Sequence, residues 1–80
     1  MTRVTLLYFA SLRDAAGCAS ETIETSDSTL HALYASLSSR HRFVLPSDRV
    51  RVAVDGAFAD WDDVPRDGSE IAFIPPVSGG

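Results

Sequence analysis

The apolar residues of this chain fall into segments with two different spacings. Residues 4–9 form a nearly unbroken run of β-favouring side chains, which is typical of a strand buried on both faces. Residues 70–74 have the same character near the other end of the chain. Residues 21–25 instead alternate polar and apolar positions around Ile23, which predicts a half-exposed edge strand. We therefore expect the first and last strands to lie in the middle of one sheet.

The main helix is predicted over residues 29–41. Its apolar positions recur at i, i+3, i+4 and i+7 and so lie on one stripe that can face a core: Leu30, Leu33, Tyr34 and Leu37. The turn at residues 26–28 offers an N-cap for this helix. A shorter helix of about two turns is expected between a capping signal at Ser11 and a stop at Gly17.

Between the main helix and the last strand, the pattern predicts a hairpin. Residues 50–54 alternate in the manner of a strand, Asp55 and Gly56 are a strong tight-turn signal, and residues 57–59 return. One substantial helix and several short strands combine most economically as a mixed sheet that is covered on one face. We therefore predict an α+β, β-grasp (ubiquitin-like) fold with a mixed sheet of about five strands, a main helix and a short extra helix.

The end of the chain differs in composition from the body. It consists of Pro75, Pro76, Val77, Ser78, Gly79 and Gly80. The prolines end ladder pairing and favour an extended backbone, and the glycines carry no side chain, so that the terminal carboxylate can enter a narrow channel. We predict a body of residues 1–76 and a flexible tail of residues 77–80, whose reactive atom is the carboxyl carbon of Gly80.

An exposed apolar patch is predicted beside this tail. Alternation along the last strand turns Ile71 and Phe73 toward the main helix and Ile74 away from it. Because exposed apolar patches mark partner sites, we predict a docking surface for a partner protein on the outer sheet face. Its residues are Leu7, Phe9, Phe58 and Ile74. An alternative stays open, in which the connector at residues 42–45 or another loop covers this face.

Charge and cysteine content restrict the class of partner and the compartment. Eleven acidic and seven basic residues give a net charge of −4, so no broad basic surface for nucleic acid or for an anionic membrane is expected. A large partner is expected to offer a basic surface. The single cysteine, Cys18, allows no internal disulfide and suits a reducing compartment. Since no apolar run approaches the length of a membrane span, we expect a cytoplasmic, soluble protein.

Other candidate chemistry is sparse, and we predict no bound metal or cofactor. Cys18 lies in a predicted loop with no basic neighbour that would activate its thiol. His31 and His41 are ten residues apart, have no further ligands in a metal-binding pattern, and are expected to be solvated. An acidic loop, expected to be solvated or to steer a basic partner, is formed by Asp60, Asp62 and Asp63.

The run Phe-Ile-Pro-Pro-Val-Ser-Gly-Gly at residues 73–80 resembles the C-terminus of the small, sulfur-carrying subunits of molybdopterin synthase. The Asp67-Gly68 turn and the Tyr-Phe-Ala-Ser-Leu-Arg run at residues 8–13 resemble the same family, so the likeness covers essentially the whole chain. It implies that Gly80 is adenylated by an ATP-using adenylyltransferase of the ubiquitin-activating type. A sulfur-donating enzyme would then convert the carboxylate into a thiocarboxylate.

The resemblance also implies the main partner. The tail, from Pro75 to Gly80, would thread into the large subunit of the synthase, with which small subunits form a heterotetramer. Two thiocarboxylated chains in succession would convert a cyclic pterin precursor into the molybdopterin dithiolene. This chain would supply the carried sulfur, and its partners would supply the catalytic side chains.

Carboxylate chemistry is consistent with this route, and two further functions share the same ending. A terminal carboxyl group has a pKa of about 3.3–3.7, so it is ionised at neutral pH and resists nucleophiles until adenylation provides a leaving group. The first alternative is a sulfur carrier for thiamine or cysteine synthesis. The second is a ubiquitin-like modifier that is conjugated to proteins through Gly80. Neighbouring genes for a large synthase subunit would separate the pathways, and adducts on lysines would support the modifier.

Overall fold

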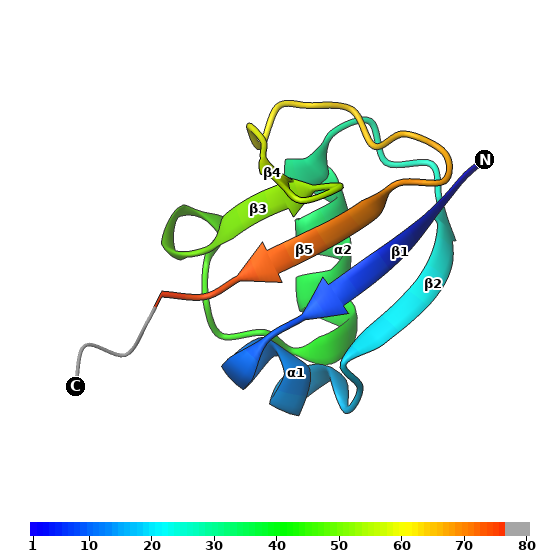
Figure 1. The fold of residues 1–80 in the computed structure, drawn as a ribbon. Helices are drawn as coiled ribbons and strands as arrows, with labels where there is room; N and C mark the ends of the chain where they lie inside the picture. The colour runs from blue at the N-terminus through cyan, green and yellow to red at the C-terminus, as the bar shows by residue number, and fades with distance from the viewer. Residues whose placement is uncertain (77–80) are drawn as a thin grey trace.

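A mixed sheet with one long helix across it makes up the part of the chain that the computed structural model describes, residues 1–76. The elements in chain order are β1 (Thr2–Tyr8), α1 (Ala10–Ala16), β2 (Ser20–Thr25), α2 (Leu30–His41), the short 3-10 helix η1 (Ser47–Arg49), β3 (Arg51–Val54), β4 (Ala57–Phe58) and β5 (Glu70–Ile74). The strand order is β2-β1-β5-β3-β4, and α2 crosses one face of this sheet (Figure 1). This arrangement confirms the predicted β-grasp fold of the α+β class.

The first and last strands lie at the centre of the sheet, as their apolar runs predicted. β1 and β5 run parallel, and their ladder pairs Leu6 with Ile71 and Tyr8 with Phe73. The neighbours on either side, β2 and β3, are both antiparallel to this central pair. β2 lies at the edge of the sheet, where Ile23 is only half-buried, in agreement with its alternating pattern.

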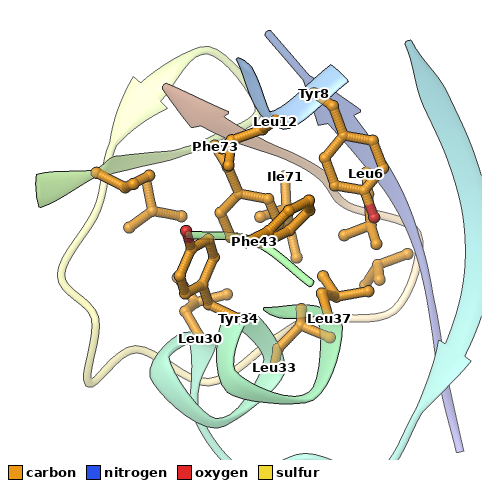
Figure 2. Packing of buried hydrophobic residues seen from close by; sticks show 13 residues of the cluster. Leu6, Tyr8, Leu12, Leu30, Leu33, Tyr34, Leu37, Phe43, Ile71 and Phe73 are labelled. Atoms are coloured by element: carbon orange, nitrogen blue, oxygen red, sulfur yellow. The ribbon is translucent and has the colours of Figure 1, made fainter. Parts of the chain in front are cut away.

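The hydrophobic core lies between the sheet and α2 (Figure 2). The predicted helix stripe is buried together with the inward-facing residues of the two central strands. This core contains Val4, Leu6, Tyr8, Leu12, Leu30, Leu33, Tyr34, Leu37, Phe43, Val50, Val52, Ile71 and Phe73. Because every second residue of β1 and β5 points into this core, the opposite face of the sheet is left to Leu7, Ala72 and Ile74.

The start of α2 is capped by a different residue from the one predicted. The Oγ1 atom of Thr29 accepts a hydrogen bond of 3.0 Å from the Ala32 N–H, which makes Thr29 the N-cap. Asp27, in the predicted capping turn, instead accepts bonds from the hydroxyls of Thr25 and Ser36. The side chain of Asp27 therefore anchors the turn to β2 and α2, and the cap falls on the next suitable residue.

α1 also begins earlier than its sequence signal. It starts at Ala10, and the predicted cap at Ser11 lies inside the helix, so that prediction is wrong. The Phe9 carbonyl accepts the first helical bond, 3.0 Å from the Leu12 N–H, and the Leu12 side chain is buried in the core. The predicted stop is confirmed, since Gly17 ends the helix with a φ of 77°.

Candidate docking groove and carrier terminus

The chain leaves the sheet at the end of β5, beside the end of β1. These two strands are parallel, so their carboxyl ends lie at the same end of the sheet, and the backbone leaves the sheet through Pro75 and Pro76 (Figure 1). Phe9 follows β1 directly and lies near this exit. The predicted tail residues Val77, Ser78, Gly79 and Gly80 lie outside the described residues, so the role of Gly80 stays a prediction.

The outer face of the sheet carries an apolar depression, which we call the docking groove. It is lined by Leu7, Phe9, Ala53, Gly56, Phe58, Glu70, Ala72 and Ile74. All four residues of the predicted patch are therefore brought together. Phe58 is 65% exposed and Phe9 is 45% exposed, which is unusual for large aromatic side chains unless a partner covers them.

The ladder registers explain why this face is hollowed. Ala72 lies at the centre, where it pairs with Leu7 of β1 on one side and Ala53 of β3 on the other. Ala53 also pairs with Phe58. The two small alanine side chains thus form the floor, and the larger apolar side chains stand around them. The connector at residues 42–45 does not cover this face, because Phe43 packs into the core instead.

A second cleft adjoins the docking groove at the exit of the chain. It is lined by Phe9, Ala10, Ser11, Leu45, Ile74, Pro75 and Pro76. Phe9 and Ile74 belong to both depressions, so they form the ridge between the sheet face and the proline spacer. A partner that covers the groove would therefore reach the backbone that leads into the tail.

A half-buried polar network lies on the other side of the sheet and was not foreseen. The Tyr8 hydroxyl donates to Oε2 of Glu21 at 2.5 Å, and the same oxygen is 2.8 Å from Nε2 of His41. The prediction that His41 is solvated is wrong, since only 13% of its side chain is exposed. The network joins residues of β1, β2 and the end of α2. These residues are too far apart in sequence for any local pattern to connect them.

The environment of this network shifts two pKa values. Burial, together with the neighbouring Glu21 carboxylate, raises the pKa of Tyr8 well above its ordinary value. Burial also acts to raise the pKa of Glu21, but the hydrogen bonds from Tyr8 and His41 outweigh it, so that this pKa lies below its ordinary value. Glu21 therefore favours its ionised form in the folded protein.

Replacing Glu21 is expected to lower stability in a pH-dependent manner. At neutral pH, Glu21→Gln should cost about 1 kcal/mol or more, and each kcal/mol corresponds to about 4–8 °C in melting temperature. Because folding lowers the pKa of Glu21, its contribution is complete above the unfolded value of about 4.3 and is lost as the pH falls below it. The wild type and the variant should therefore melt at converging temperatures between pH 7 and pH 3.

Calorimetric melting curves across this pH range check the expectation. Glu24→Gln is the matched control, since Glu24 is an exposed acid of the same strand whose pair with Arg3 lies at the surface. A difference between wild type and Glu21→Gln that stays constant down to pH 3 would show that the carboxylate is not the stabilising form.

Cys18 and the acidic loop, the other candidates from the sequence, make contacts that support the fold. Cys18 is half-buried and packs against the core. The acidic loop is exposed, as predicted, and its backbone caps α2, because the carbonyls of Trp61 and Asp63 accept bonds from the His31 and Leu30 N–H groups.

Within residues 1–76 there is no cluster of three His, Cys, Asp or Glu side chains that could hold a metal ion. No helix of this part is long and apolar enough to cross a bilayer.

Two curated relatives match this chain over nearly its full length. The molybdopterin synthase sulfur carrier subunit of Mycobacterium tuberculosis is 35% identical over 83 residues, which cover 100% of both chains. The subunit of the same name from Escherichia coli is 31% identical over 80 residues, which cover 96% of this chain and 99% of the relative. The match to the Mycobacterium tuberculosis subunit therefore spans both the groove and the C-terminus of this chain.

Solved structures with the same fold support the relationship. A Pyrococcus furiosus protein described as molybdopterin converting factor, subunit 1, superposes with a TM-score of 0.81 at 29% identity and covers 96% of this chain and all of its own. A chain from a complex of subunits 1 and 2 of the Helicobacter pylori factor covers 99% of this chain and all of its own, with a TM-score of 0.65 at 20% identity, which shows the fold alone. The ThiS family model matches residues 6–80. This chain belongs to the ThiS family.

Proposed function

We propose that this chain is the sulfur carrier subunit of a molybdopterin synthase and that Gly80 carries the sulfur. The observation with most weight is that full-length relatives at 31% and 35% identity are themselves sulfur carrier subunits of this enzyme. The docking groove supports the proposal, because it lies beside the point where β5 leads into the Pro75–Pro76 spacer.

The chemistry of the terminus requires two activation steps. The Gly80 carboxylate attacks the α-phosphorus of ATP and displaces pyrophosphate, which leaves a mixed anhydride with AMP. Hydrosulfide supplied by a sulfur-donating enzyme then attacks the carbonyl carbon and displaces AMP, which gives the thiocarboxylate. A ubiquitin-activating-type adenylyltransferase would bind the ATP, so this chain needs no bound cofactor of its own.

The second half of the proposal concerns the delivery of sulfur in the active site of the large subunit. The docking groove binds that subunit, and the segment from Pro75 to Gly79 threads into its active site with Gly80 at the tip. Sulfur transfer to the pterin precursor followed by hydrolysis returns the carboxylate. A closed site that excludes water protects the thiocarboxylate from premature hydrolysis. On this proposal the chain is a sulfur donor, and its partners catalyse each step.

Reconstitution tests this function directly. Thiocarboxylated protein and the large subunit from the same organism should convert the pterin precursor into the dithiolene, while the carboxylate form should not. Two outcomes would contradict the proposal. One is sulfur delivery only to a thiazole- or cysteine-forming enzyme, and the other is accumulation of the chain as isopeptide adducts on lysines of other proteins.

Cys18 is expected to have no part in sulfur transfer. Cys18→Ala should retain wild-type turnover in the reconstituted synthase, because the transferred sulfur resides on Gly80 in this mechanism. The side chain packs against the core, so a modest fall in melting temperature is expected beside unchanged turnover. A variant that folds normally but delivers no sulfur would instead move the carrier site to the thiol.

A further inference from the structure

A cationic side chain stands at the end of the docking groove where the chain leaves the sheet. Arg51 pairs with Ile74 in the antiparallel ladder of β3 and β5, so both side chains project from the outer sheet face. The guanidinium carbon of Arg51 lies 4.4 Å from the centroid of the Phe58 ring. Both residues are exposed, and the aromatic ring therefore holds the guanidinium at the rim of the groove.

The Arg51 guanidinium lies over the ring of Phe58. A guanidinium that lies on an aromatic face keeps its donors in its own plane, where a carboxylate can accept two parallel hydrogen bonds. Neither of the ion pairs formed within residues 1–76 involves Arg51. The pair of Arg51 and Phe58 is thus arranged for an anionic group that arrives from outside this part of the chain.

Two side chains of opposite charge lie at opposite ends of the groove. Glu70 lines the groove at the start of β5, whereas Arg51 lies beside the end of that strand. Apolar side chains and the alanine floor separate the two charges. A partner surface with an apolar centre, an acidic side chain at one end and a basic one at the other matches this pattern in only one orientation, because the reverse places like charges together.

We propose that Arg51, held by Phe58, binds a side-chain carboxylate of the large subunit that docks in the groove. The inference rests on the proposed function, since it takes the large subunit as the occupant. The ion pair fixes the direction in which the partner's surface lies along the groove. It thereby sets where the chain beyond Pro76 enters the partner.

Calorimetric titration of the large subunit with the full-length chain at two salt concentrations tests this pair. Arg51→Glu is expected to weaken binding about tenfold or more at low salt. Arg51→Met keeps an apolar side chain over Phe58 and should weaken binding less, while it reduces the salt dependence. Arg3→Glu is the control, because Arg3 lies on the same sheet face at the far end of β1, and it should change affinity by less than about twofold.

The outcomes separate this inference from the proposed function. A wild-type chain that neither binds the large subunit nor delivers sulfur would refute both. A wild type that binds and delivers sulfur, with Arg51 variants of equal affinity and salt dependence, would refute the ion pair alone. Normal binding of Arg51→Glu combined with slow adenylation would assign the anion to the activating enzyme or its nucleotide, which also refutes the pair.

Discussion

A chain that ends at Gly79, or that extends one residue beyond Gly80, is expected to lose sulfur transfer while it keeps its fold. The reacting carbon must reach a fixed depth in each partner, and a misplacement of about 1 Å can slow a reaction about 100-fold. One residue of extended chain spans about 3.3–3.6 Å, so either change exceeds that tolerance. The core residues run from Val4 to Phe73, and neither change removes a core side chain.

Single-turnover transfer to the large subunit, measured beside a melting curve, checks this expectation. The matched control carries one extra residue before Met1, which adds the same length at the other end of the chain. It should transfer sulfur at the wild-type rate. Normal transfer by a chain that mass spectrometry shows to be extended past Gly80 and unprocessed would contradict a fixed position for the terminal carbon.

Ile74→Asp is expected to weaken binding to the large subunit by about tenfold or more, because docking would bury an unpaired carboxylate. Ile74 belongs both to the docking groove and to the cleft beside the proline spacer. It faces away from the core, so the melting temperature should change by only a few degrees, while a core substitution would lower it far more.

Val44→Asp provides the matched control for this substitution. Val44 is a β-branched residue that is 90% exposed and lines neither depression, so an aspartate there should leave affinity unchanged. Titration calorimetry and melting curves on both variants decide the matter. Unchanged affinity for Ile74→Asp would mean that the tail alone carries recognition, and a large loss of stability would mean that Ile74 supports the core.

Much of the fold was predictable because it depends on patterns that repeat within one element. Apolar runs predicted the two central strands, helical spacing predicted the buried stripe of α2, and Asp55-Gly56 predicted a hairpin turn in which both residues have positive φ. The docking groove followed from strand parity, since a ladder that buries Ile71 and Phe73 must turn Ile74 outward.

The remaining features depend on contacts between elements, which no local pattern specifies. The capping predictions failed because the Asp27 side chain accepts hydrogen bonds from Thr25 and Ser36 instead, and because the Phe9 carbonyl accepts the first hydrogen bond of α1. The contact of His41 with Glu21 exists only once α2 lies across the sheet. The contact between Arg51 and Phe58 could have been predicted from the sequence, since a tight turn at residues 55–56 brings the two residues close together on the same face.

The most direct test of a carrier terminus is the intact mass of the protein isolated from growing cells, with fragmentation to locate any added sulfur. Sulfur in place of one oxygen at the carboxyl group of Gly80 is the predicted result, and the modified fraction should rise when the large subunit is deleted and fall when the adenylyltransferase is deleted. Sulfur found on Cys18, or a terminus that is never sulfurated while the chain accumulates on the lysines of other proteins, would contradict it.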